Sequence, residues 1–404
     1  MRRIGSFLLA VCMIAGCLAG CGQTREPSSA DNSQRLEAPV VPNRTATSLD
    51  PTELEALESY RVVEGSDQTA GSDILNNAQA STLRSFTQTT MAGAFTERIG
   101  WNVFYSPAAS FSALSAGTAS GASKAQSLLN VLSLSSAEML DLSQTYLAWQ
   151  PSAVSIWADT GKLSLTSAEA INQLALGYHA DVYELPILNE TAVEYMKSWV
   201  CDNTVFAAGI EDYDVDLNVD SAADSMVLSV VDATATFAKK FPDSANMRFL
   251  NGSGELTSAA FMLGMIDECD YKEEISFKLA RVETDDGDMI FVLPVGSSSI
   301  RSIMSDAAFL DELDDFDSSH ESGAVNWAIP KVQVDSALHY MTVDQFIRLN
   351  FDNNGINSDV QPAESYGRQS SDKSAFDMSL TEPFGCVVRD SAGNIRFAGI
   401  VNYV

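Results

Sequence analysis

Basic residues are scarce in this chain of 404 residues, because 24 Lys and Arg stand against 54 Asp and Glu, for a formal net charge of −30. Binding to nucleic-acid phosphates and to acidic membrane surfaces both depend on clustered Lys and Arg. The composition therefore argues against nucleic acid as a partner and against a polybasic membrane-binding surface. Hydrophobic residues still make up 46% of the chain, which is enough for a buried core.

The common catalytic and metal-binding motifs are also missing. The sequence has no G-x-S-x-G, no H-E-x-x-H, no C-x-x-C and no glycine-rich phosphate loop. The three histidines, His179, His320 and His339, are scattered along the chain. We therefore predict no catalytic residues, no metal and no cofactor.

Two acidic stretches carry several carboxylates close together, as cation sites do. Asp212, Asp214, Asp216, Asn218 and Asp220 alternate along the chain, but an EF-hand loop needs Gly at its sixth position and Glu at its twelfth, and both are absent. The second stretch, from Asp311 to Asp317, is expected to be a solvated loop or the end of a helix.

The only long apolar run lies near the N-terminus. It follows Arg2 and Arg3 and extends from Ile4 to Leu18, which is short for a membrane span and typical of a secretory signal. It ends in Leu18-Ala19-Gly20-Cys21, which resembles the lipobox of bacterial lipoproteins. The resemblance implies that residues 1–20 are removed and that Cys21 carries the lipid, palmitate included, on the extracellular face of the bacterial cell membrane.

Two alternatives to this anchor remain. A second lipobox-like copy, Ile14-Ala15-Gly16-Cys17, leaves a shorter apolar run, and a plain cleaved signal peptide is also consistent with the leader. In either case Cys12 is lost with the leader, and Cys201, Cys269 and Cys386 remain in the body of the chain. Their odd number and wide spacing favour buried free thiols with at most one disulfide.

Composition divides the rest of the chain into two parts. Residues 21–71 are rich in Ser, Thr, Pro and acidic residues, which predicts a disordered tether, with a short helix possible over 51–57. Residues 72–404 contain no second linker and no repeat, which indicates one large domain. Helical spacing over 75–96 and 110–134 precedes alternating or apolar strands at 289–293, 325–329, 385–390 and 395–401, and this order predicts an α+β fold.

Segments of this domain resemble those of serpins, and they occur in the order of that family. The matching segments are Asn102 to Ser110 (N-x-F-x-S-P-x-S), Gly121-Ala122 with Leu128 to Leu132, Tyr195 to Thr204 around Trp199-Val200, Met226 to Phe237, Phe291 to Pro294, Ile329-Pro330-Lys331-Val332, and the C-terminal Glu382-Pro383-Phe384, Val388-Arg389-Asp390 and Phe397 to Asn402. Two departures are the missing Asn at 195–197 and Asp232 where Asn is usual. The resemblance implies a single domain with helices packed on large, mostly antiparallel sheets.

The resemblance also implies a function. Inhibitory serpins present a reactive loop to a serine or cysteine protease and, once cut, insert that loop as a new strand into the main sheet. On this basis Arg368 is the first candidate for the residue at the cleaved bond and Lys373 the second, while an ordinary loop arginine is the plain alternative at 368.

The loop region departs from the inhibitory pattern. We expect a helix over Thr342 to Leu349 and the family's Gly-Ile at Gly355-Ile356, which leaves residues 357–375 for the loop. That length looks too short for insertion, and the nearest candidates for a small-residue hinge are 365–371 and Ser374-Ala375. A serpin-fold binding or scaffold module without inhibition is therefore the competing hypothesis. A solute-binding lipoprotein, with two α/β lobes around a cleft, fits the C-terminal hairpin poorly.

Overall fold

The computed structural model describes residues 51–66, 68, 74–97, 101–122, 130–165, 167–186, 188–204, 217, 224–371 and 374–404. The predictions for the leader, for Cys21, for the acidic residues 212–220 and for Lys373 lie outside these residues. In the described part of the chain, no helix is both long and apolar enough to cross a bilayer.

Helices occupy mainly the first half of the described chain. They are α1 (Pro51–Tyr60), α2 (Asn77–Glu97), α3 (Pro107–Ser120), α5 (Ser136–Trp149), α6 (Ala168–Asn172), the π-turn η1 (Gln173–Gly177), α7 (Glu190–Asn203), α8 (Ile300–Met304) and α9 (Phe309–Ser318). The start of α3 follows the expected signal, because Ser106 accepts a hydrogen bond from the Ala109 N–H and Pro107 takes the first helical position.

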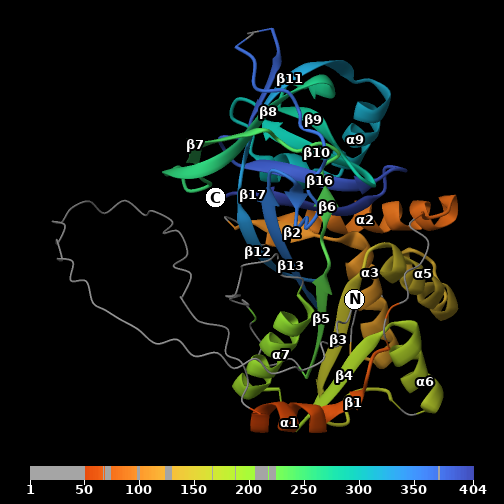
Figure 1. Cartoon of the computed structure of the whole chain (residues 1–404). Coiled ribbons are helices and arrows are strands. Elements are labelled where there is room, and N and C mark those ends of the chain that lie inside the picture. The colour runs from red at the N-terminus through yellow and green to blue at the C-terminus, as the bar shows by residue number, and fades with distance from the viewer. Residues whose placement is uncertain are drawn as a thin grey trace, which may run out of the picture.

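The first sheet, called here the main sheet, forms the lower half of the molecule in Figure 1. Its strands run in the order β1-β4-β3-β5-β13-β14-β6, and β12 pairs with β13. The bounds are β1 (Arg61–Val63), β3 (Ser152–Asp159), β4 (Ala180–Leu185), β5 (Ser225–Val231), β6 (Ala235–Thr236), β12 (Gln333–Tyr340), β13 (Val343–Asp352) and β14 (Gly355–Ile356). Two neighbouring pairs, β3 with β4 and β5 with β13, are parallel.

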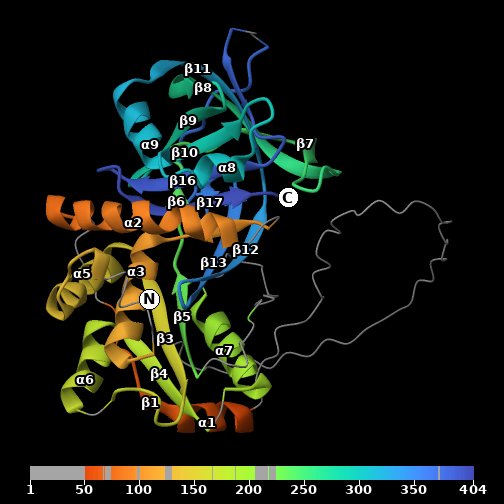
Figure 2. The ribbon, with the colours of Figure 1, turned by 180° about the vertical axis from the view of Figure 1, so that it is seen from behind.

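The second sheet lies above it, and α2 crosses between the two halves (Figure 2). Its order is β15-β11-β8-β9-β10-β16-β17-β2, and β7 pairs with β8. The bounds are β2 (Val103–Tyr105), β7 (Asp243–Leu250), β8 (Leu256–Glu273), β9 (Phe277–Thr284), β10 (Gly287–Pro294), β11 (Glu321–Pro330), β15 (Phe376–Ser379), β16 (Phe384–Asp390) and β17 (Ile395–Val401). Except for β11 with β15, its pairs are antiparallel, so the α+β prediction with mostly antiparallel sheets is confirmed.

The predicted C-terminal hairpin is present as β16 and β17. The Asp390 carboxylate closes its turn, because Oδ1 accepts the N–H groups of Ala392 at 3.0 Å and Asn394 at 2.8 Å, and Gly393 takes the left-handed conformation at φ 83°. Both strands are largely buried, and the Phe384 side chain is in the core.

The helix predicted over Thr342 to Leu349 is wrong, because this segment is most of strand β13. A two-residue turn joins β12 to β13, and both of its residues, Met341 and Thr342, have positive φ values of 55° and 74°. Positive φ at both positions is the hairpin geometry that Asn-Gly usually indicates. The residues Met341 and Thr342 are not typical of such a turn, so the sequence did not predict a hairpin here. Strand β13 is buried on both faces, which hides the alternation that distinguishes a strand from a helix.

The folded part also begins earlier than the predicted boundary at residue 72. The short helix expected over 51–57 is present as α1, and β1 pairs antiparallel with β4 at the edge of the main sheet. Leu57 is buried there, and the ring of Tyr60 lies 6.3 Å from that of Tyr195 on α7. Residues 51–63, assigned to the tether from composition, therefore form part of the structure.

Candidate functional site

The candidate site is the long loop between β14 and β15, which carries Arg368. The loop starts with a tight reversal, because β13 ends at Asp352 and the chain turns back at once through Asn353 and Asn354. Strand β14 then pairs antiparallel with β13 on one side and with β6 on the other. Gly355 has φ 139° in this reversal, a value that only glycine adopts readily.

Asn357 fastens the first residues of the loop to the main sheet. Its backbone is left-handed at φ 46°, and its side-chain amide donates to the carbonyls of Ala233 at 2.8 Å and Arg348 at 2.6 Å. Its Oδ1 accepts the Asn350 N–H at 2.9 Å. Ala233 follows β5, and the other two partners are on β13. This one side chain therefore bridges the C-terminal ends of the two parallel strands.

The middle of the loop lies against the second sheet. The Tyr366 N–H donates to the Lys240 carbonyl at 3.0 Å, and the backbones of Gly367 and Met265 exchange two hydrogen bonds of 2.8 and 3.0 Å. The Tyr366 ring packs 5.1 Å from that of Phe241, and burial raises the pKa of the Tyr366 hydroxyl. At this point the loop therefore pairs with β8 as a very short additional strand would.

The residues on either side of Arg368 are held as well. The Gln369 side chain donates to the Trp327 carbonyl at 2.7 Å, and Ser370 and Asn326 exchange two hydrogen bonds of 3.0 Å. The side chain of Arg368 itself is 83% exposed, with its Nε 3.6 Å from Asp243. The structure therefore presents the Arg368 side chain to solvent on a backbone whose polar groups are largely occupied.

These contacts correct two expectations about the loop. The segment 365–371, the nearest candidate for a hinge, is the docked part of the loop, and the chain reverses direction at Asn353, Asn354 and Gly355. Strand β13 rather than a helix precedes the loop, and residues 353–356, which include β14, connect the end of β13 at Asp352 to the loop at 357–375. The expectation that the loop is too short counts from residue 357, whereas the chain after β13 starts at residue 353.

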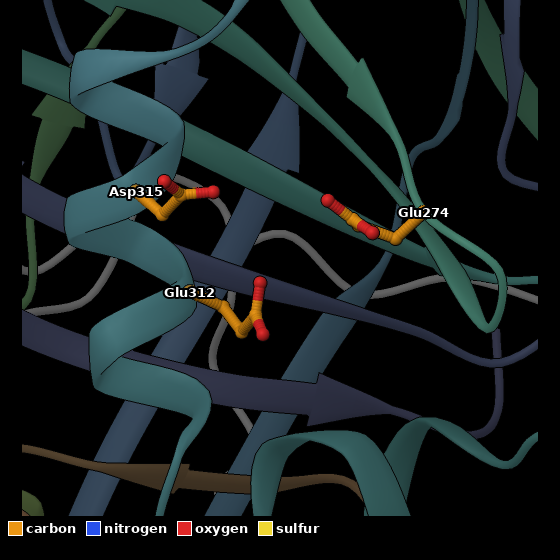
Figure 3. Close-up of side chains that lie close together, drawn as sticks. All are labelled: Glu274, Glu312 and Asp315. Carbon is orange, nitrogen blue, oxygen red and sulfur yellow. The ribbon is translucent and has the colours of Figure 1, made fainter.

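The acidic residues at 311–317, expected to be a solvated loop or the end of a helix, lie on helix α9 and extend into its last turn. Each of four cations from other elements pairs with this helix: Arg84 with Asp311 and Asp314, Lys272 with Asp315, and Arg281 and Arg389 with Asp317. Glu274, Glu312 and Asp315 approach one another closely enough to suggest a cation site (Figure 3). The Lys272 ammonium is already there, 2.6 Å from Glu274 and 2.5 Å from Asp315, so two of the three acids have a structural partner.

A pocket of about 260 Å³ lies on the other side of α9, between this helix, α2 and the β16–β17 hairpin. Leu83, Leu310 and Leu313 give it an apolar lining, and Arg84 and Asp314 pair across it at 2.6 Å. An apolar cleft with a few charged groups is the usual form of a small-molecule site.

Of the thiols, Cys269 lies near the loop, because it lines a pocket together with Ser365, Tyr366 and Gly367. Cys201, Cys269 and Cys386 are free, and burial raises the pKa of Cys201 to about 11 and that of Cys269 to about 12. His179 bonds Ser66 at 2.8 Å, His320 lies 3.3 Å from Asp270, and His339 lies 3.0 Å from Asp344. The structure does not bring the histidines together.

Sequence reasoning selected Arg368 but missed the residues that hold the loop. The turn signal Asn353-Asn354-Gly355 was present in the sequence and could have indicated the reversal. Asn357 and Tyr366 gave no local signal, since their partners are distant in the sequence.

The fold was compared with known proteins. No protein-family model and no curated protein sequence matches the chain. Among solved structures, the thermophilic serpin tengpin in its native state matches with a TM-score of 0.61 at 15% identity, over 85% of this chain and 98% of its own.

Two further solved structures give the same result. Human thyroxine-binding globulin with thyroxine has a TM-score of 0.63 at 12% identity, over 81% of this chain and 98% of its own. Native protease nexin-1 with heparin has a TM-score of 0.61 at 14% identity, over 81% and 100%. At these identities the likeness concerns the fold, and it agrees with the motif order and with the two sheets. The chain has the serpin fold.

Proposed function

We propose that this chain is a serpin-family inhibitor of serine or cysteine proteases, with the bond after Arg368 as bait. The observation that carries the proposal is the pairing of β5 with β13 in the main sheet. These strands are parallel and adjacent over Val227–Val231 and Val343–Ile347. A strand entering between them would run antiparallel to both, which is the direction of a chain that turns back after β13.

The length of the loop supports insertion. Sixteen residues, 353–368, separate the end of β13 from the candidate bond, whereas β13 itself has ten. At about 3.3 Å per residue, these sixteen residues would extend roughly 50 Å, more than the roughly 33 Å of β13. Cleavage after Arg368 would therefore free enough chain to lie along the whole strand.

In the resting state, the loop would be docked on the two sheets and its candidate bond would be closed to a protease. Asn357 bridges the C-terminal ends of β5 and β13, and Tyr366 and Gly367 hold the loop to the second sheet. A protease must pair with the backbone beside the bond that it cuts, so the docked loop has to lift before attack. Inhibition would be slow until the loop is released.

Trypsin tests the proposed bait. We expect the full chain, purified in detergent and incubated with trypsin, to form a covalent adduct that survives denaturing electrophoresis, with cleavage mapped after Arg368 by mass spectrometry. Arg368→Gln should abolish the adduct at that bond while the unfolding temperature stays unchanged, because this side chain is exposed. Cleavage after Arg368 without an adduct would contradict the proposal.

A second candidate function is small-molecule binding without inhibition. The pocket between α2, α9 and the C-terminal hairpin favours it, and one of the similar solved structures is a thyroxine-binding protein. Simple cleavage of the loop without an adduct would support this second candidate over the first. Both candidates assign a binding or inhibitory role without catalysis.

We propose that the protein acts on the outer face of the bacterial membrane, held there by lipid on Cys21 and by the chain that follows it. The proposal rests on the lipobox-like Leu18-Ala19-Gly20-Cys21 after a signal-like apolar run. We expect labelled palmitate to enter the wild-type chain and not Cys21→Ser. Equal labelling of the two chains would exclude Cys21, and Cys17→Ser is the matched control.

A further inference from the structure

A second pocket, of about 390 Å³, opens at the base of the loop. Four segments meet there: the chain before and at the start of β7, the residue after β11, the β13–β14 turn, and the first half of the loop. The lining residues are Lys240, Phe241, Pro242, Ser244, Lys331, Asp352, Asn353, Asn354 and Gln361. This volume is in the range of small-molecule sites.

The charge of this pocket is unusual for so acidic a chain. Most lysines and arginines in the described residues are engaged by carboxylates, as Lys239 is by Glu364 at 3.2 Å and Lys272 by Glu274 at 2.6 Å. Lys240 and Lys331 form no ion pair within that part of the chain, although both are half-buried. In a chain with a net charge of −30, two ammonium groups against the one carboxylate of Asp352 give this lining a local excess of positive charge.

The remaining lining groups favour an acceptor ligand. Asp352 is the one carboxylate among the lining residues, and its Oδ1 already accepts the Asn354 N–H at 2.7 Å. Asp243, next to the pocket, faces Arg368, and Glu364 faces Lys239. The lining side chains that carry hydrogen-bond donors are the two ammonium groups, the amides of Asn354 and Gln361, the amide of Asn353, which donates to Phe241 and Asp243, and the hydroxyl of Ser244, which donates to Asn353 at 3.3 Å. Such donors suit a phosphate or sulfate group, which carries several acceptor oxygens.

The backbone fixes this arrangement. The Lys240 N–H donates to the Glu364 carbonyl at 3.0 Å, and the Lys331 N–H donates to the Ala260 carbonyl at 2.7 Å. The turn is held by Asn353, whose side-chain amide donates to the Phe241 carbonyl at 2.7 Å and to the Asp243 carbonyl at 3.3 Å. The two lysines therefore project from anchored positions rather than from mobile chain.

We propose that this pocket binds the phosphate or sulfate group of a small molecule through Lys240, Lys331 and Gln361. Because Gln361 belongs to the loop and Lys331 to the body, a bound anion contacts both and holds the loop docked. This consequence for inhibition rests on the proposed function, whereas the binding itself does not. A ligand that binds only the docked state stabilises that state by mass action.

Calorimetric titration of the full chain with inorganic phosphate tests the site. Binding to the wild-type chain is expected, with Lys240→Gln and Lys331→Gln each weakening it by at least about tenfold. Arg248→Gln is the matched control. Arg248 does not line this pocket and forms no ion pair within the described residues, and its replacement changes the net charge by the same amount. Sodium chloride at equal ionic strength corrects for screening, and unfolding temperatures check that the three variants are folded.

Two results would overturn the binding proposal: no heat of binding up to millimolar phosphate, or equal weakening by all three variants. Glucose 6-phosphate and inorganic sulfate as further titrants distinguish a phosphorylated small molecule from a free oxyanion, since a sugar phosphate fills more of the pocket. Phosphate should also slow trypsin cleavage after Arg368 in the wild-type chain and not in Lys331→Gln. Binding without that protection would refute the link to the loop, and neither result depends on adduct formation.

Discussion

Arg389→Met is expected to lower the free energy of unfolding by about 3–5 kcal/mol, the usual cost of breaking a buried ion pair by removing one partner. The Arg389 side chain is 4% exposed. Its Nε and Nη2 donate to the two oxygens of Asp288 at 2.9 and 2.7 Å, and it donates to Asp317 at 2.7 and 3.0 Å. Methionine fills similar volume but leaves the Asp288 carboxylate, which is 13% exposed, beside one remaining cation, Arg281.

Urea unfolding followed by circular dichroism measures this effect. Arg84→Met is the matched control, since Arg84 also pairs with two carboxylates of α9 but its side chain is 40% exposed. An exposed ion pair contributes about 0–1 kcal/mol, so the control should change stability little. Equal losses in the two variants would show that the burial of Arg389 is not what makes its ion pairs important.

The same ion pairs predict a pH dependence. Burial raises the pKa of Asp317, but the hydrogen bonds and charge of Arg389, with the charge of Arg281, outweigh burial and lower it overall. A lowered pKa stabilises the fold above the ordinary Asp value of about 3.9, and this contribution is lost as pH falls through the folded-state pKa. The stability difference between wild type and Arg389→Met should therefore shrink below about pH 4.

Asn357→Ala is expected to release the start of the loop and to speed trypsin cleavage after Arg368 by roughly a hundredfold. The substitution removes three hydrogen bonds, to Ala233, Arg348 and Asn350, each worth about 0.5–1.5 kcal/mol. It also places alanine at φ 46°, where asparagine is tolerated better. Cleavage follows the population of the open loop when opening is fast compared with cutting.

Two variants separate the causes. Asn357→Gly keeps the left-handed backbone and loses only the side-chain hydrogen bonds, so it should retain most of the increase. Tyr366→Ala releases the middle of the loop by removing its packing on Phe241, whereas Tyr366→Phe should behave like the wild type because the hydroxyl has no partner in the described residues. If Asn357→Ala and Asn357→Gly were cut at the wild-type rate, the Asn357 bridge would not control loop opening.

Several features of this protein were determined by its sequence alone. The α+β class, the helix start at Ser106-Pro107 and the C-terminal hairpin each depend on local chemistry: a capping hydroxyl, a fixed proline φ, and a turn closed by Asp390. The order of the serpin-like segments predicted the fold that the solved structures share. The choice of Arg368 as a basic residue in the loop also depended only on the local sequence and on that resemblance.

The tertiary structure decided the rest, because the deciding contacts join residues distant along the chain. Segment 343–352 forms strand β13 because β5 and β12 supply its hydrogen bonds. Both of its faces are buried, so its sequence lacks the alternation of apolar and polar residues that predicts a strand. The closed loop depends on Asn357 reaching Ala233 and on Gly367 pairing with Met265. Likewise, Lys240 and Lys331 share one pocket only because four segments meet there. Local propensity acts over a few residues, whereas these pairings exist only once the sheets have assembled.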